Sequence, residues 1–376
     1  MSVIVDGSNG LIFNDASTQT TAATGFGFKN RIINGAMIID QRNAGASVTP
    51  NGAYTLDRWL FSNSQTGKAT VQQNAASVTP PAGFVNYAGI TSASAYSITS
   101  TDYFLYEQAI EGLNVTDFGW GTANAQPITI SFWVRSSLTG TFGGSVNNNA
   151  QNRTYPFAYT ISASNTWEQK SITILGDTTG TWLTTNGIGM RLRFSLGTGA
   201  TYSSTAGAWT STSLIFAPTG ATSVVGTNGA TFYITGVQLE KGSTATAFDY
   251  RDFGRELALC QRYFTKSFAT TTAPANSSVA PYEGVGASFA GAYVSSNFVP
   301  FLVTMRAVPT LTYYSSGNGT PANGVWQIYD GGWANAGSFN GSNITVNGFQ
   351  NSWYYASATL KSSYYISGHF TASAEI

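Results

Sequence analysis

Hydrophobic and polar residues alternate strictly along two stretches of the chain. One is residues 128–136, ITISFWVRS, in which Ile, Ile, Phe and Val alternate with Thr, Ser, Trp and Arg, and the other is residues 188–196, IGMRLRFSL. A period of two residues is typical of a strand with one buried face. The aromatic-rich residues 102–110 and the less regular residues 232–240 predict two further strands, with Gly236 as a β-bulge in the second.

Long polar loops separate the predicted strands. Residues 142–153, FGGSVNNNAQNR, are one example, rich in glycine and asparagine. The chain has 41 glycines and long Ser/Thr runs, and these residues favour strands and turns over helices. Many strands joined by such loops, without helical spacing between them, predict an all-β fold with an antiparallel jelly-roll β-sandwich over residues 30–266.

A single segment has helical periodicity and is predicted to form one short helix at the end of the sandwich. Four side chains recur at the spacing of one helical face: Phe253, Leu257, Cys260 and Phe264. Asp252 is suited to cap the helix, and Glu256 in the first turn suits its dipole, as do Arg262 and Lys266 toward the far end. We expect this helix to close the first domain or to connect it to the next.

The chain changes in character on both sides of the sandwich. After a polar stretch at residues 270–281, charged residues become rare and aromatic residues frequent, which predicts a second, smaller β domain over residues 267–376. Residues 1–29 form an extended N-terminal arm that is too polar to build a core of its own. Its one apolar patch consists of Leu11, Ile12 and Phe13. We expect other copies of the chain and a larger particle to cover this patch.

Charged residues make up only 9% of the 376 residues, against about 25% in ordinary soluble proteins. The 17 basic and 17 acidic residues give a net charge of zero. Such a chain has no basic face for nucleic acid and no polybasic anchor, and no apolar run approaches the ~18 residues that a membrane-spanning helix needs. We therefore expect no nucleic-acid partner and no membrane insertion. Neutral surfaces of this kind are typical of contacts with like subunits or with sugars.

Residues suited to catalysis are sparse. The only cysteine, Cys260, and the only histidine, His369, lie far apart in the sequence, so neither a zinc site nor a Ser-His-Asp triad is predicted, and we expect Cys260 to be a buried structural thiol. None of the 17 acidic residues pairs in a motif typical of polysaccharide hydrolysis. Asp57 and Arg58 are interpreted as a structural ion pair or a turn contact. We predict that the protein is not an enzyme and has no catalytic residue.

Two carboxylates flank the loop KGSTATAF. Glu240 precedes it and Asp249 follows it, and oxygen ligands in such a position can bind a structural Ca²⁺. The prediction is that the protein has no cofactor and no metal, with a structural Ca²⁺ at these two carboxylates as the alternative.

Aromatic residues in the C-terminal region suggest a glycan-binding surface. Neutral glycans stack their CH-rich faces on exposed rings, while Asn, Asp and Gln hold the hydroxyl groups. Rings cluster beside glycine and polar residues in residues 325–337, VWQIYDGGWANAG, and in residues 350–357, QNSWYYAS. The candidate glycan-binding residues are Trp326, Tyr329, Asp330, Trp333, Trp353 and Tyr354. The alternative is that these rings fill the core; Trp133, which alternates away from the core, could also be exposed.

Several motifs resemble those of phage structural proteins. Residues 7–22, GSNGLIFNDASTQTTA, resemble the short N-terminal motif of many phage tail-fibre and virion-appendage proteins. Residues 30–49, 54–59 and 236–264 resemble a family of phage and prophage structural proteins whose jelly roll is similar to carbohydrate-binding modules. Residues 367–376, SGHFTASAEI, are similar to the usual C-terminus of that family.

The resemblance implies a virion appendage, similar to a tail fibre, on the tail or the capsid of a phage particle. It implies a homotrimer whose N-terminal arm, with Leu11, Ile12 and Phe13, attaches to other virion proteins. A host-surface glycan is the implied partner of the C-terminal domain. The alternatives are a capsid decoration or head-fibre protein without a receptor role and, further, a polysaccharide depolymerase.

Overall fold

The computed structural model describes residues 29–276, 282–288, 293–317, 324–336, 339–355 and 361–376, with three short strands before them. These are β1 (Ile4–Asp6), β2 (Gly10–Ile12) and β3 (Thr18–Gln19), which form an antiparallel sheet with β2 in the middle. Leu11 and Ile12 lie in β2, but their side chains and the whole of Phe13 lie outside the described residues. The predicted attachment contacts therefore stay a prediction.

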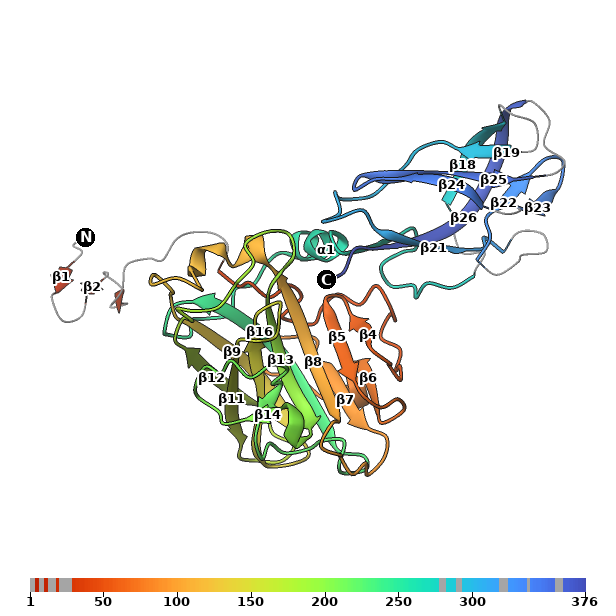
Figure 1. Cartoon of the computed structure of the whole chain (residues 1–376). Helices are drawn as coiled ribbons and strands as arrows, with labels where there is room; N and C mark the ends of the chain where they lie inside the picture. The colour runs from red at the N-terminus through yellow and green to blue at the C-terminus, as the bar shows by residue number, and fades with distance from the viewer. Residues whose placement is uncertain are drawn as a thin grey trace.

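The first body of the protein is a sandwich of two antiparallel sheets (Figure 1). The six-stranded sheet has the order β11-β10-β13-β8-β5-β4, and the five-stranded sheet has the order β12-β9-β16-β7-β6. The strands of the first are β4 (Ala53–Leu56), β5 (Trp59–Asn63), β8 (Tyr103–Glu111), β10 (Gly140–Asn147), β11 (Thr154–Ile161) and β13 (Ile188–Thr198). Those of the second are β6 (Ala69–Gln73), β7 (Ala88–Ser92), β9 (Ile128–Ser136), β12 (Glu168–Ile174) and β16 (Thr231–Lys241). The predicted all-β jelly-roll sandwich is confirmed.

The core of the sandwich lies between the two sheets, and the predicted alternation places its residues. Strand β9 contributes Ile128, Ile130, Phe132 and Val134, and strand β13 contributes Met190, Leu192, Phe194 and Leu196; all of these are fully buried. Phe132 and Phe194 meet across the two sheets with ring centroids 4.9 Å apart. Alternate apolar side chains of each strand therefore lie on the same face of the sheet and are withdrawn from water. Burial of this apolar surface is the main driving force for the fold.

The predicted bulge at Gly236 is also confirmed. The register between β16 and β9 shifts between Thr235 and Gln238, and Gly236 has a φ of 60°. A Cβ atom at this position would lie 2.6 Å from the ring of Phe84. Only glycine meets both conditions without strain.

Short elements connect the strands of the sandwich. The 3₁₀ helices are η1 (Ala75–Ser77), η2 (Gly112–Asn114), η3 (Thr116–Phe118) and η4 (Ala200–Tyr202), and β14 (Ser203–Ser204) pairs with β15 (Ala217–Pro218) in a small parallel sheet. Residues 199–218, which we call the covering segment, lie over the outer face of the six-stranded sheet. The ring of Pro218 approaches Gly143 of β10, and Phe216 lies under the guanidinium of Arg193 from β13.

Helix α1 (Phe253–Gln261) begins where the sequence predicts and ends earlier. Its first turn is capped because Asp252 Oδ1 accepts a hydrogen bond of 2.9 Å from the backbone N–H of Arg255. The prediction of a helical face that includes Phe264 is wrong, because Phe264 leaves the helix and pairs with Ser373 in a sheet. Of the three residues of this face that stay in the helix, Phe253 is 56% exposed and Leu257 is partly buried, so only Cys260 is fully buried. None of the described helices is long and apolar enough to cross a membrane.

The second body is a smaller β structure built around one long strand. Strand β26 (Lys361–Ser373) pairs with four others: β17 (Phe264–Lys266), β18 (Tyr282–Ser288), β21 (Thr310–Tyr314) and β22 (Gln327–Tyr329). Further strands are β19 (Tyr293–Ser296), β20 (Val299–Pro300), β23 (Trp333–Asn335), β24 (Phe339–Ile344) and β25 (Gly348–Tyr354). The predicted second β domain is confirmed. Strand β17, which we expected within residues 30–266, belongs to its sheet; the boundary between residues 266 and 267 stays a prediction.

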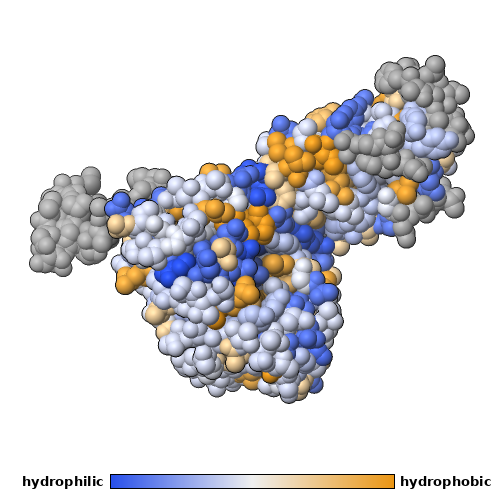
Figure 2. Space-filling model, in the orientation of Figure 1, coloured by the Kyte–Doolittle hydropathy of each residue, from blue (hydrophilic) through white to orange (hydrophobic). Residues whose placement is uncertain are grey.

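The surface of the second body carries several large apolar side chains. Leu302 is 71% exposed, Val308 61% and Phe298 49%. Figure 2 shows such apolar surface in patches on both bodies, among broad areas of intermediate hydropathy. This surface is consistent with the low charge content of the chain.

The two bodies meet at helix α1, beside the last residues of the chain (Figure 1). The carboxylate of Glu375 enters the first body and pairs with Arg42 at 2.6 Å and with Arg58. Glu111, at the end of β8, in turn forms ion pairs with Arg262 at 3.1 Å and with Arg306 of the second body at 3.4 Å. Ion pairs that are largely withdrawn from water therefore connect the two bodies.

Asp57 and Arg58 have structural roles, as predicted, but they do not pair with each other. The carboxylate of Asp57 accepts hydrogen bonds from the backbone N–H of Gln41 at 2.7 Å and from its side-chain Nε2 at 2.8 Å. Arg58 lies 3.6 Å above the ring of Tyr263 and pairs with Glu375. Both residues are fully buried, and their partners Gln41, Tyr263 and Glu375 lie in other segments of the chain.

The buried carboxyl of Asp57 predicts a pH dependence of stability. Burial raises its pKa from 3.8 to about 6, while Arg42 and the bonds from Gln41 act in the opposite direction. Because the folded state keeps this proton to a higher pH than the unfolded chain, the contribution is lost as pH rises from about 4 to about 6. At about 1.4 kcal/mol per pH unit, we expect the stability of wild type relative to Asp57→Asn to fall by roughly 2–3 kcal/mol over this range. Urea denaturation of both proteins at several pH values measures this difference, and a pH-independent difference would contradict the raised pKa.

Candidate functional site

The structure places two of the predicted glycan-binding residues in the core of the second body. Trp326 is 1% exposed and Trp353 is 3% exposed, and their rings stack with centroids 5.3 Å apart. The indole N–H of Trp326 donates a 2.8 Å hydrogen bond to the backbone oxygen of His369 on β26. The prediction that these two rings bind a glycan is therefore wrong, because strand pairing turns both toward the core, where no sugar can stack on them.

The other predicted residues lie on the outer side of the same sheet. Tyr329 is 42% exposed and contacts Trp333 across strands β22 and β23 with ring centroids 5.4 Å apart; Asp330 lies in the turn between them. Tyr354 is 41% exposed and contacts Tyr293 of β19 at 5.6 Å. Strands β18 and β26 separate these two groups in the sheet, so the structure does not bring the predicted residues together in one site.

The two residues considered for catalysis are buried in separate places. Cys260 is fully buried, and burial raises the pKa of its thiol well above the ordinary value, so the prediction of a structural thiol is confirmed. His369 is also buried; its Nδ1 lies 3.1 Å from the hydroxyl of Ser267, and its ring stacks on Phe268 at 3.9 Å.

A cleft of about 360 Å³ lies on the outer face of the six-stranded sheet, and we call it the sheet cleft. Its floor is a row across three strands, since Leu60 of β5 pairs with Glu107 of β8, and Glu107 pairs with Arg193 of β13. Arg193 Nε donates to Glu107 Oε2 at 2.5 Å. The two charged residues are only 4% and 5% exposed, although they lie on the outer face of the sandwich.

The two terminal nitrogens of Arg193 also donate hydrogen bonds. Its Nη1 donates to Asn147 Oδ1 at 3.1 Å and its Nη2 to Gln151 Oε1 at 2.9 Å, while the guanidinium lies 4.6 Å above the ring of Phe216. A planar guanidinium held on three sides and stacked on a ring has a fixed position. The floor of the cleft is therefore ordered before any ligand arrives.

Aromatic side chains form one wall of the sheet cleft. Tyr202 of the covering segment stacks on Phe216 with ring centroids 4.9 Å apart, and Tyr103 of β8 meets the two rings edge-on at 5.7 and 5.4 Å. Tyr103 and Tyr202 are partly exposed, whereas Phe216 is buried beneath them. The wall thus combines apolar ring surface with phenol hydroxyls.

The last residues of the chain line the opposite end of the cleft. The hydroxyl of Tyr54 donates a 2.7 Å hydrogen bond to a backbone oxygen of Ile376, and both residues line the cleft. Burial, together with the charge of Glu375, raises the pKa of Tyr54 to about 12, so the hydroxyl stays protonated and acts as a donor at neutral pH. The geometry of the cleft consequently depends on how the second body is attached.

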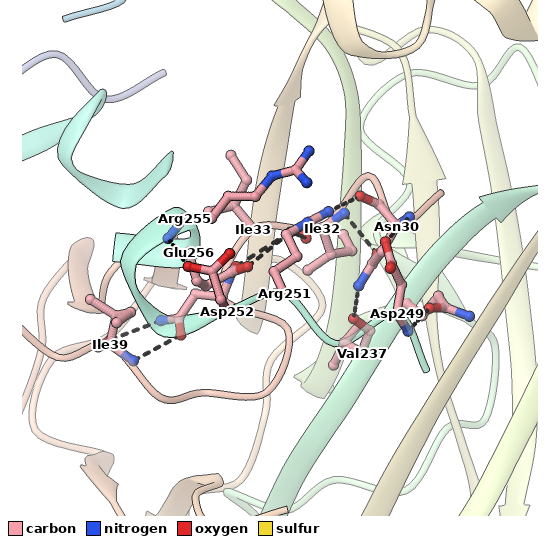
Figure 3. A network of polar contacts seen from close by, with 12 residues as sticks. Asn30, Ile32, Ile33, Ile39, Val237, Asp249, Arg251, Asp252, Arg255 and Glu256 are labelled. Carbon is pink, nitrogen blue, oxygen red and sulfur yellow. Dashed lines mark hydrogen bonds and ion pairs between the residues drawn. The ribbon is translucent and has the colours of Figure 1, made fainter. Parts of the chain in front are cut away.

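A second, smaller hollow of about 140 Å³ lies beside the segment that enters the first body. Its aromatic lining consists of Phe84, Phe248 and Tyr250, whose ring centroids lie 4.8–5.6 Å apart. Figure 3 shows the adjacent polar network, in which Arg251 donates to the backbone oxygen of Ile32 at 3.0 Å and to Glu256 at 3.1 Å. These groups hold residues 30–34 against helix α1 and serve the structure of the domain.

The two carboxylates considered for Ca²⁺ have separate protein partners. Glu240 accepts hydrogen bonds from the backbone N–H and the hydroxyl of Thr246, at 2.9 and 2.7 Å, whereas Asp249 accepts the backbone N–H of Asn30 at 3.2 Å. In the part of the chain that the structure describes, no three His, Cys, Asp or Glu side chains come together as metal ligands. A structural Ca²⁺ at this loop stays a prediction.

The sequence did not point to the sheet cleft. The alternation in residues 188–196 places the polar residues of β13 correctly on the outer face of the sheet. Residues on an outer face are normally expected to be exposed to solvent, whereas Arg191 and Arg193 line a cleft. Opposite charges at Glu107 and Arg193, which lie in two of the predicted strands, were the available signal. This signal could be used only with the knowledge that β8 and β13 are neighbours.

Comparison with known proteins gives only distant similarities. No protein-family model and no curated protein matches the sequence. The enzymatically active domain of tailspike protein 4 of bacteriophage CBA120 is similar with a TM-score of 0.31 and 13% identity, over 56% of this chain and 21% of that chain. A family 11 carbohydrate-binding module from Clostridium thermocellum, in complex with a mixed-linked tetrasaccharide, has a TM-score of 0.27 and 12% identity over 54% of this chain and 98% of its own. A xylan-binding domain from Paenibacillus barcinonensis has a TM-score of 0.26 and 11% identity over 54% and 99%. TM-scores this low carry no argument about function, so the site is interpreted from its own residues.

Proposed function

We propose that the protein is a structural component of a phage appendage that binds a glycan in the sheet cleft. The observation that carries the proposal is the combination of a partly exposed aromatic wall, Tyr103 and Tyr202, with a fixed polar floor, Glu107 and Arg193. A pyranose ring can stack on the wall while Gln151 and the edge of the Glu107–Arg193 pair hold its hydroxyl groups. Because the floor is already ordered, little entropy is lost on binding.

The same arrangement favours binding without cleavage. Hydrolysis of a glycosidic bond ordinarily requires two carboxyl groups on opposite sides of the bond. Glu107 is the only carboxylate side chain among the residues that line the cleft, and it is already paired with Arg193. A depolymerase therefore stays the less favoured alternative.

Replacing the tyrosine of the wall tests this proposal. Tyr202→Ala removes a ring on which a sugar would stack, so we expect the affinity for a bound glycan to fall by about 1–3 kcal/mol. Binding is measured on an array of bacterial surface glycans and then by calorimetry, with a thermal melt of each protein. The control is Tyr250→Ala, which removes a 58% exposed tyrosine outside the cleft and should leave the affinity unchanged. Equal affinity of the Tyr202 variant and wild type would exclude the cleft as the glycan site.

A second glycan contact on the second body remains an alternative. The exposure of Tyr329 and its contact with Trp333, beside Asp330, favour it, and Tyr354 offers a separate exposed ring. The wider role rests on the sequence motifs: a homotrimer that attaches through its N-terminal arm to other virion proteins, with a capsid decoration or head-fibre protein as the alternative. The position of the chain on an imaged virion distinguishes these, since a tail tip favours receptor binding and a capsid lattice position favours decoration.

A further inference from the structure

Arg191 lines the sheet cleft without a carboxylate partner. It lies two residues before Arg193 on β13, opposite Ala109 of β8, so both arginines point to the same face of the sheet. Its Nη1 donates to the backbone oxygen of Asn149 at 3.2 Å. Within the part of the chain that the structure describes, no ion pair joins Arg191 to an acidic side chain.

The acidic side chain of the cleft does not serve Arg191. Glu107 compensates Arg193, with which it shares a 2.5 Å contact, and no other acidic side chain lines the cleft beside Arg191. Burial and the neighbouring charge of Arg193 lower the pKa of Arg191, while the charge of Glu107 and Tyr54 act in the opposite direction. A guanidinium nevertheless stays protonated in proteins. A partly buried cation without a counter-charge is electrostatically unfavourable, and an anionic ligand would relieve this cost.

We infer that the ligand of the sheet cleft is an acidic glycan, whose anionic substituent pairs with Arg191 while its sugar ring stacks on the tyrosine wall. This inference rests on the proposed function and names the class of glycan. A planar carboxylate or a phosphate group accepts two parallel hydrogen bonds from a guanidinium, which gives both affinity and orientation. Arg193 is less suited to this role, because each of its three guanidinium nitrogens already donates a hydrogen bond, to Glu107, Asn147 and Gln151 in turn.

The chain offers a matched control for this charge. Arg135 lies on β9 in the other sheet, is also partly exposed, and donates from Nε to one backbone oxygen, that of Asn165, at 2.9 Å. Like Arg191, it is joined by no ion pair to an acidic side chain of the described residues. Arg191→Gln and Arg135→Gln therefore remove the same charge and a similar hydrogen bond, but only the first lies in the cleft.

The experiment measures binding of the full chain to uronic-acid-containing capsular polysaccharides, to their carboxyl-reduced neutral forms and to phosphorylated oligosaccharides. We expect the native acidic form to bind roughly 10- to 100-fold more tightly than its reduced form. Arg191→Gln should abolish this preference without lowering the melting temperature, and Arg135→Gln should retain it. A preference for the phosphorylated probe would identify phosphate as the anion and supports the same inference.

Three outcomes would overturn the inference, and they separate it from the proposed function. Equal binding of native and reduced forms, lost in Tyr202→Ala, would refute an acidic ligand while the glycan cleft stands. A preference that survives in Arg191→Gln would refute the assignment to Arg191. Absence of binding to every probe at millimolar concentration would refute both the inference and the proposed function.

Discussion

Glu375→Gln is expected to lower the free energy of unfolding by about 3–5 kcal/mol, the cost of removing one partner from a buried ion pair. The side chain of Glu375 is 7% exposed and that of Arg58 is 1% exposed. A glutamine can accept from one guanidinium through its oxygen, but its NH₂ group then faces the other. At least one buried cation is left unpaired, although the shape of the side chain is preserved. Denaturant unfolding of the full chain measures the loss.

A matched control exists on the surface of the first body. Asp117 also bridges two cations, Arg31 at 3.0 Å and Lys241 at 3.6 Å, but its side chain is 47% exposed. Water and salt screen such a carboxylate, so Asp117→Asn should change the free energy of unfolding by no more than about 1 kcal/mol. If both substitutions had equally small effects, the ion pairs at Glu375 would not hold the two bodies together.

The same substitution connects stability to the cleft. Ile376, the neighbour of Glu375, accepts a hydrogen bond from the hydroxyl of Tyr54 and lines the sheet cleft. Loss of the buried ion pairs removes the constraint on this residue, so the end wall of the cleft depends on the contact between the bodies. The protein can in this way couple the attachment of the second body to ligand binding in the sheet cleft of the first.

Local patterns in the sequence were sufficient for the sandwich. The alternation in residues 128–136 and 188–196 identified the core face of β9 and β13, and Asp252 identified the start of α1. The end of α1 could not be predicted, because apolar spacing would have continued the helix to Phe264. Pairing of Phe264 with Ser373, near the other end of the chain, decides that boundary instead.

The site depends even more strongly on contacts that are distant in the sequence. The covering segment brings Tyr202 and Phe216 over the row formed by Glu107 and Arg193, and no local pattern shows this. In the second body, Trp326 and Tyr329 occur within one short aromatic stretch, yet one is buried and the other exposed. The register between β22 and β26 decides which of the two side chains is buried, because a one-residue change of register would exchange the two faces of the strand.

Trp326→Ala is accordingly expected to destabilise the second body by about 3–5 kcal/mol, the usual cost of deleting a buried tryptophan. The ring stacks on Trp353 and meets Phe349 at 6.2 Å, and its N–H donates to the backbone oxygen of His369. The ring of Trp326 packs directly against Gly368 of β26, where a Cβ atom would lie only 2.3 Å from the ring. The substitution leaves a cavity and removes the hydrogen bond to His369.

Trp333→Ala provides the comparison on the exposed face of the same sheet. Trp333 is partly exposed and contacts Tyr329 at the surface, so its removal should cost less than about 1.5 kcal/mol, within the range of an aromatic pair. Denaturant unfolding of both variants, followed by tryptophan fluorescence and circular dichroism, measures the two losses. Similar losses for the two variants would mean that Trp333 also belongs to the core, and a small loss for Trp326→Ala would mean that the ring is not enclosed by β25 and β26. A large loss confined to Trp326→Ala would place Tyr329 and Trp333 outside the core, where, like the exposed Tyr354, they stay within reach of a sugar.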